Sequence, residues 1–97
     1  MRYGSRARND EIEFVYKKTS TVPRFAIVVS TKVDTRATKR NRIRRIVSES
    51  LRHLLPLVVP VDGVFLVRQN IADLTQAETQ ALVSYLFTQA RLLNTEL

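Results

Sequence analysis

The feature that most constrains the fold is a set of residues spaced three and four apart in the middle of the chain. They are Ile43, Ile46, Val47, Ser50, Leu51 and Leu54. This spacing places them on one side of an α-helix, and that side must pack against a core. We expect the helix to run from about Lys39 to His53, with Thr38 as its N-cap. Any fold of this chain must therefore bury one face of this helix.

The same helix begins within a block of positive charge. Residues 36–45 (RATKRNRIRR) hold six cations and no acid. Like charges this dense repel one another, so their collection on one element indicates a polyanionic partner. Arg36, Arg40 and Arg44 are four apart and predict an exposed stripe. The planar guanidinium group matches phosphate oxygens two at a time, so the sequence predicts nucleic acid as the partner.

An ordinary solvated helix face is the alternative interpretation of this block. Such a face usually carries acids four residues away from its cations. Only Glu49 occupies such a position, four after Arg45. Asn41, Arg45 and Arg52 are expected on exposed positions beside the stripe. The charge pattern therefore favours nucleic-acid contact.

Charge is divided unevenly along the 97 residues. The net charge is +9 for residues 1–52 and −2 for residues 53–97, which indicates a binding half and a mainly structural half. The chain has no cysteine, so it has no disulfide and no thiolate nucleophile or metal ligand. No apolar run approaches the roughly 18 residues that would span a membrane. We therefore predict a single cytoplasmic domain over residues 1–97.

Strand patterns surround the helix. Residues 1–8 are short and basic and predict either an edge strand or a mobile segment, while residues 11–17 alternate as in a half-exposed strand. Residues 25–30 (FAIVVS) predict a central strand covered on both faces, and residues 64–67 predict a second buried strand.

A second helix is predicted at the C-terminal end. Thr75 with Glu78 forms the pattern of a capping box. Its apolar stripe is predicted at Ala77, Ala81, Leu82, Tyr85, Leu86, Gln89, Leu92 and Leu93. The order of strands and helices indicates an α+β fold with one sheet and two helices.

Two aromatic residues of the strand at residues 11–17 are candidates for stacking on unpaired bases. Phe14 and Tyr16 alternate onto one face, and every base offers a π-face to such rings. Core packing is the alternative, and it is favoured for Phe14 and Phe25. Tyr16 lies beside Lys17 and Lys18, so we expect it to be the more exposed aromatic.

Catalytic patterns are weak in this sequence. Asp10, Glu11 and Glu13 are close enough to suggest a carboxylate metal cluster, but no other residue supports one. His53 is expected at the end of the basic helix, where it meets the C-terminal dipole. No triad or glycine-rich phosphate loop is present, so we predict no catalytic residue and no metal ligand in the protein.

Residues 29–33 (VSTKV) and 36–52 (RATKRNRIRRIVSESLR) closely resemble the signature region of the bacterial ribonuclease P protein subunit. The family's Arg-Asn-Arg box corresponds to residues 40–42, and the cation that trails the box corresponds to Arg45. Residues 62–68 (DGVFLVR) and 74–93 resemble its fourth strand and last helix. Further matches are Ser30, Lys32, Glu49 and Arg52.

The resemblance implies a fold like that of ribosomal protein S5 domain 2, with a left-handed crossover through the basic helix against the usual right-handed rule. It also implies a large catalytic RNA that hydrolyses a phosphodiester to remove the 5′ leader from precursor tRNA. Mg²⁺ ions would be held by that RNA and its substrate. The implied partners are the catalytic RNA and precursor tRNA, with no membrane and no evident protein partner.

The pattern and the resemblance together give two sets of predicted contacts. Those to the catalytic RNA are Arg36, Lys39, Arg40, Asn41, Arg42, Arg44, Arg45 and Arg52. Those to the leader, on the exposed side of the sheet, are Phe14, Tyr16, Lys17 and Lys32. The family usually begins with a helix that supplies one wall of a cleft. Residues 3–8 (YGSRAR) resemble the segment after it, so we expect that helix to be absent and the cleft to have one wall.

Three other classes of protein compete with this interpretation. A structural RNA-binding protein of ribosomal type shares the charge pattern but has no role in cleavage. A DNA-binding repressor would normally carry a shorter helix-turn-helix pairing without a β-rich scaffold. A protein-only nuclease would need clustered acids, which this sequence lacks.

Overall fold

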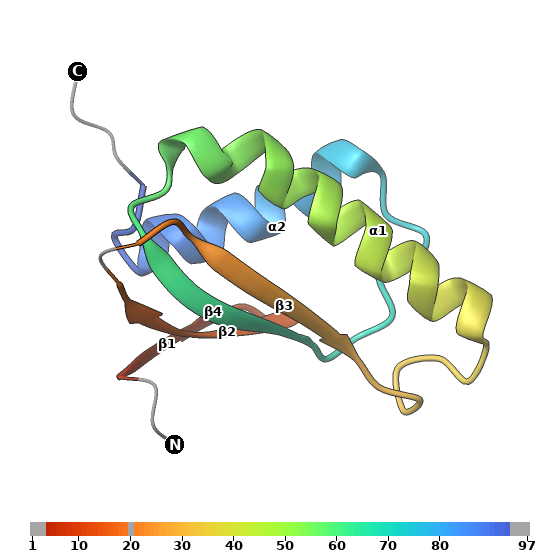
Figure 1. The fold of residues 1–97 in the computed structure, drawn as a ribbon. Coiled ribbons are helices and arrows are strands. Elements are labelled where there is room, and N and C mark those ends of the chain that lie inside the picture. Colours follow the sequence, from red (N-terminus) through yellow and green to blue (C-terminus); the bar gives the residue numbers. More distant parts are fainter. Residues whose placement is uncertain (1–3, 20, 94–97) are drawn as a thin grey trace.

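The computed structural model describes residues 4–19 and 21–93. Its elements are β1 (Ser5–Arg8), β2 (Ile12–Lys18), β3 (Arg24–Val29), α1 (Ala37–Leu54), the 3-10 turn η1 (Leu55–Leu57), β4 (Val61–Val67) and α2 (Gln76–Gln89). The strands form one sheet in the order β1-β2-β4-β3, and both helices lie on the same side of it (Figure 1). The predicted α+β fold is confirmed. Within the described residues no helix is long and apolar enough to cross a membrane.

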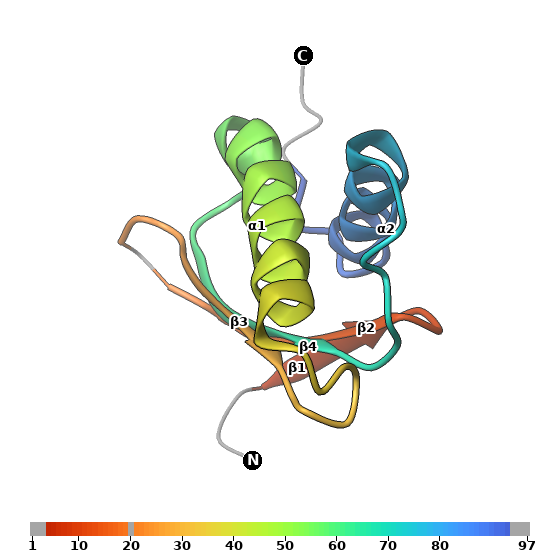
Figure 2. The same ribbon diagram turned by 90° about the vertical axis from the view of Figure 1, so that its right-hand side faces the viewer.

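The connection from β3 through α1 to β4 sets the position of the basic helix. β4 is antiparallel to β2 and parallel to β3, so α1 must return the chain to the same end of the sheet. Figures 1 and 2 together show that this crossover is left-handed, as the resemblance implied. As a result α1 packs over β3, at one edge of the sheet, and α2 packs over β1 and β2.

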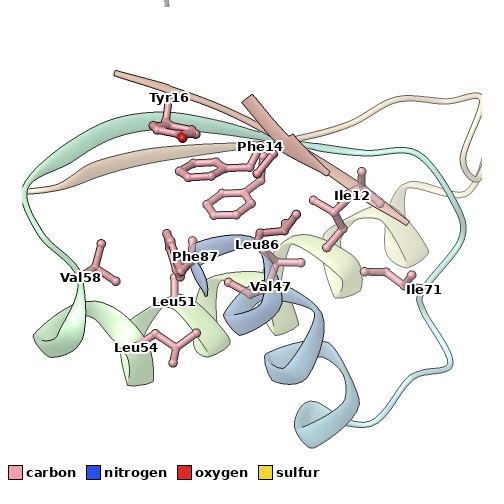
Figure 3. Packing of buried hydrophobic residues seen from close by; sticks show 14 of the residues in the cluster. Ile12, Phe14, Tyr16, Val47, Leu51, Leu54, Val58, Ile71, Leu86 and Phe87 are labelled. Atoms are coloured by element: carbon pink, nitrogen blue, oxygen red, sulfur yellow. The ribbon is translucent and has the colours of Figure 1, made fainter. Parts of the chain in front are cut away.

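Aromatic rings fill the core between the sheet and the helices. Phe14 stacks on Phe65 with 4.3 Å between ring centroids, and Phe87 of α2 meets Phe14 edge-on at 5.5 Å (Figure 3). Gly63 makes room for this packing, because a Cβ there would lie 2.2 Å from Cε1 of Phe14. The glycine in β4 is therefore required by a close approach.

Two expectations about the strands have different outcomes. The edge strand expected in residues 1–8 is confirmed for Ser5–Arg8, and residues 1–3 lie outside the described residues. The expectation that residues 25–30 form a central strand is wrong, because β4 lies between β2 and β3 and leaves β3 at the edge. Val28 is accordingly 46% exposed. The apolar run therefore predicts neither the order of the strands nor burial on both faces.

The helix boundaries also differ in part from the predictions. Thr38 is not an N-cap: α1 begins at Ala37, after Arg36, and has no side-chain cap. The capping box of Thr75 and Glu78 is confirmed. The predicted stripe of α2 is confirmed only for its leucines, since Leu86 and Leu92 are buried. It is wrong for Ala77, Ala81, Tyr85 and Gln89, which are exposed, and it omits the buried Thr79, Val83 and Phe87. Apolar residues lie all around this helix, so their spacing alone does not select the buried side.

Candidate nucleic-acid interface

The residues predicted to contact the catalytic RNA all lie on α1 or at its N-cap. Ile43 and Val47 are fully buried beneath the helix and fix which side faces solvent. Ile46, expected to be buried, is only half-buried. The most exposed members of the set are Arg36, Asn41, Arg42, Arg45 and Arg52, whereas Lys39, Arg40 and Arg44 are half-buried. The outward side is therefore centred further around the helix than the predicted stripe.

Two arginines of the Arg-Asn-Arg box hold neighbouring loops in place. Nη1 of Arg40 donates to the carbonyl oxygens of Asp34, at 3.0 Å, and Thr35, at 2.9 Å. Nε of Arg42 donates to the carbonyl oxygen of Ala72, at 2.7 Å, in the loop before α2. Each guanidinium thus satisfies backbone acceptors that lie beyond the helix. These two side chains combine positive charge with a bracing role that the sequence pattern did not predict.

Arg36 is held by a buried acid. The carboxylate of Asp34 accepts from the backbone N of Arg36 at 2.8 Å, from its Nε at 3.1 Å and from its Nη2 at 2.9 Å. Nδ2 of Asn70 donates to the same carboxylate at 3.0 Å. The Arg36 side chain, with its backbone N–H and the Asn70 amide, holds the pKa of Asp34 well below its usual range. Asp34 and Asn70 were missed because 36 residues separate them.

The outward side of α1 is less constrained. Among the described residues, the side chains of Lys39 and Arg45 have no hydrogen-bond or ion-pair partner. Arg44 bonds to Asn41, and Arg52 pairs with Glu49, whose pKa is lowered by that bond. A groove of about 200 Å³ lies beside these residues, lined by Arg42, Arg45, Ile46, Glu49 and Gln76. Free cations beside a groove suit contact with a folded polyanion.

The two aromatic leader candidates lie on the wrong side of the sheet. Phe14 is fully buried and Tyr16 is only 9% exposed, and both point into the core (Figure 3). The alternation of side chains along residues 11–17 correctly predicted that both rings share one face of the sheet. It did not predict that the helices cover that face. The expectation of an exposed Tyr16 is therefore wrong, and neither ring is available for stacking on a base.

The two lysines predicted for the leader are exposed. Lys17 lies on the sheet face opposite the helices, which we call the helix-free face, in register with Asp62 of β4. Asp62 in turn lies opposite Arg24 of β3. Lys32 lies in the loop between β3 and α1. The structure thus provides exposed positive charge at these predicted positions without the expected aromatic platform.

A further group of arginines gathers on the helix-free face around one acid. The side chain of Glu13 is 9% exposed and pairs with Arg6 at 2.8 Å and with Arg68 at 2.7 Å. The bond from Arg68 lowers the pKa of Glu13. A hollow of about 350 Å³ adjoins them, lined by Arg8, Asn9, Asp10, Glu13 and Arg68. Glu13 is thus an ion-pair partner, and no group of three His, Cys, Asp or Glu suited to a metal occurs in the described part of the chain.

A core-anchored basic helix on one side of a single mixed sheet, with further arginines on the opposite face, defines a small α+β protein suited to a polyanion. The model of the family described as Ribonuclease P matches residues 1–91. The chain therefore belongs to the ribonuclease P protein family, and the resemblance carried by the Arg-Asn-Arg helix is confirmed.

Individual relatives agree with this assignment. The ribonuclease P protein component of Xylella fastidiosa is 45% identical over 69 residues, which cover 70% of this chain and 51% of the relative. That of Xanthomonas campestris is 41% identical over 63 residues, or 65% of this chain and 43% of the relative. The chain spans about half the length of the curated relatives it matches.

Solved structures share the fold. The RNase P protein of Staphylococcus aureus matches with a TM-score of 0.81 and 22% identity, covering 94% of this chain and 84% of that one. The RNase P protein of Thermotoga maritima matches with a TM-score of 0.79 and 22% identity, covering 89% of this chain and 83% of that one.

Proposed function

We propose that this chain is the RNA-binding protein subunit of a cytoplasmic ribonuclease P, which assists a catalytic RNA in removing the 5′ leader from precursor tRNA. The observation that carries the proposal is α1, a helix fixed by a buried face that presents cations without partners to solvent. Membership of the family supports the identity of the RNA. The alternative, a structural RNA-binding protein without a role in cleavage, has no observation of its own in its favour.

The outward side of α1 is the proposed contact with the catalytic RNA. Lys39 and Arg45 can turn to phosphates without breaking a bond within the protein. Arg40 and Arg42 would contribute charge while they brace the two loops. A folded RNA presents phosphates at fixed spacings, and a rigid helix matches these better than a mobile tail would.

The leader is proposed to lie across the helix-free face. Lys17 and Lys32 remain part of this surface, and Arg6, Arg8 and Arg68 extend it toward the β1–β2 turn. Since Phe14 and Tyr16 belong to the core, the leader would be held mainly through its phosphates. Such binding depends on charge and is insensitive to leader sequence.

The chemical step is proposed to belong to the RNA. Mg²⁺ ions on the RNA and substrate would activate water and stabilise the departing oxygen. Two acids support this division, because Glu13 is occupied by two arginines and Asp34 by Arg36 and Asn70. The role left to the protein is to bind and orient the two RNAs.

Reconstitution with matched charge variants tests the proposal. The probe is the ribonuclease P RNA of Xanthomonas campestris with a precursor tRNA, with and without the full chain. We expect the chain to stimulate cleavage and the RNA-free chain to be inactive. Lys39→Gln with Arg45→Gln should weaken RNA binding and flatten the plot of log affinity against log salt by about 1.4 to 1.8.

Arg91→Gln is the control for this experiment, because Arg91 follows α2, is exposed and lies outside the predicted contact sets. It should leave both the affinity and the salt dependence nearly unchanged. Binding without stimulation of cleavage would favour the structural RNA-binding alternative. A salt dependence that changes as much in the control as in the α1 variant would place the RNA surface elsewhere.

A further inference from the structure

The loop before α1 contains a carboxylate in a surface that should repel acids. The side chain of Asp34 is 4% exposed, although it lies two residues from Arg36 and beside the positively charged start of α1. A carboxylate in an RNA-binding surface costs affinity through its charge alone. Its buried and hydrogen-bonded position points to a role that offsets this cost.

The geometry of the pair leaves one edge of the Arg36 guanidinium open. Asp34 occupies Nε and Nη2, which form one edge of the planar group. Of the five N–H groups of an arginine, those on Nη1 and the second on Nη2 remain. The Arg36 side chain is 65% exposed, so the carboxylate holds the group without covering it. The remaining edge can donate two parallel bonds to one phosphate.

Asp34 is held from two other parts of the chain, one bonding to its carboxylate and one to its backbone carbonyl. Asn70 donates to Asp34 and accepts from the backbone N of Ala72 at 3.1 Å, so its own orientation is set. Arg40 of α1 bonds to the carbonyl of Asp34. The loop before α1, the first turn of α1 and the loop before α2 thus converge on one acid. A long side chain that is already ordered before binding loses less entropy when it meets its ligand.

We propose that Asp34 is a positioning residue for RNA binding, which holds the guanidinium of Arg36 ready for a single phosphodiester. The inference rests on the proposed function of α1 as the RNA surface. It contradicts simple electrostatics, because removal of a negative charge from such a surface should strengthen binding. The two views therefore predict opposite signs for one substitution.

Asp34→Asn is the test, with Asp73→Asn as the matched control. Asp73 is exposed, lies near enough to Arg36 to raise its pKa, and makes no hydrogen bond to it. Both variants remove one negative charge. We expect Asp34→Asn to weaken binding to the ribonuclease P RNA of Xanthomonas campestris by roughly two- to tenfold, the factor for ordering one long side chain. Asp73→Asn should bind as tightly as the unchanged chain or more tightly.

A double-mutant cycle separates positioning from a purely structural role. In a chain that carries Arg36→Ala, Asp34→Asn should have no further effect on affinity, because the group that it positions is gone. Thermal unfolding shows whether each variant folds. If Asp34→Asn does not, Asn70→Ala removes one of the bonds to the carboxylate and keeps its charge, and it should weaken binding only when Arg36 is present.

Equal or tighter binding by a folded Asp34→Asn variant would overturn the inference and leave the proposed function intact. The same is true if the loss of affinity persists at full size in the Arg36→Ala chain. A failure of the unchanged chain to prefer the ribonuclease P RNA over mature tRNA would instead overturn the proposed function, and the inference would fall with it.

Discussion

The two helices of this protein begin in opposite ways. α2 starts with a complete capping box, in which Thr75 accepts from the backbone N of Glu78 and the Glu78 side chain accepts from Thr75, and it carries an acid in its first turn. α1 starts at Arg36 with no side-chain cap and no acid in its first turn. Lys39 and Arg40 lie there instead, where the helix dipole disfavours cations.

The difference shows how the two helices are stabilised. α2 satisfies its own first N–H groups through local side chains. α1 depends on contacts from outside the helix, namely the buried face around Ile43 and the bonds of Arg40 and Arg42 to flanking loops. Its uncapped, cation-rich end concentrates positive potential at one place. α2 is therefore stabilised locally at its start, whereas the start of α1 is suited to the polyanion contact that we propose.

Core substitutions should have the largest effect and should affect the two helices equally. Ile43 of α1 and Leu86 of α2 are fully buried in one cluster. Each change to Ala should lower the free energy of unfolding by about 2–5 kcal/mol, because it removes buried surface and leaves a cavity. Urea unfolding followed by circular dichroism measures this. A loss below 1 kcal/mol for Ile43→Ala alone would show that α1 does not depend on the core as described.

Substitution at the start of the helix should destabilise α2 but not α1. Thr75→Ala should lower the free energy of unfolding by about 0.5–2 kcal/mol, since the backbone N–H of Glu78 loses its acceptor. Thr38→Ala is the matched control: Thr38 lies in the first turn of α1 and caps nothing. Its effect should be near zero or slightly stabilising, because alanine favours the helix. Equal losses from the two changes would contradict the contrast between the helix starts.

A lower pH should weaken the side-chain contacts around α1. Near neutral pH, a change of pH should affect stability less than the core and cap substitutions do. The pKa values of Asp34 and Glu49 are lowered, chiefly by bonds from Arg36 and Arg52. A lowered folded-state pKa gives stability that is present above the unfolded value, about 3.9 for Asp and 4.3 for Glu, and is lost as the pH falls further. Stability measured by urea unfolding should change little between pH 8 and 5 on their account and decline below about pH 4. Asp34→Asn should make that decline shallower, and Asp73→Asn should not.

Local patterns in the sequence predicted local structure well. The buried side of α1 followed from the spacing of Ile43, Val47 and Leu51, and the start of α2 followed from Thr75 and Glu78. Both signals depend on residues within one or two turns of each other. The α+β class also followed, because it needs only the order of elements.

Features that depend on the arrangement of distant segments could not be predicted. Tyr16 alternates with its neighbours on a strand, but only the placement of both helices on one face makes that face the core. The bonds of Asp34 with Asn70 and of Arg42 with Ala72 join residues that are 36 and 30 positions apart in the chain. A pattern of charge shows that arginines are numerous, but it does not show which of them are already engaged within the protein.

The central position of β4 has a consequence for how the chain is made. Among the described strands β3 pairs only with β4, and 38 residues separate the C-terminal ends of the two strands. At translation rates of roughly 5–20 residues per second, this separation corresponds to about two to eight seconds. During that interval β1 and β2 can already form a hairpin, but β3 has no neighbour and α1 has no complete core to cover. The basic helix is thus synthesised before the strand that completes its support.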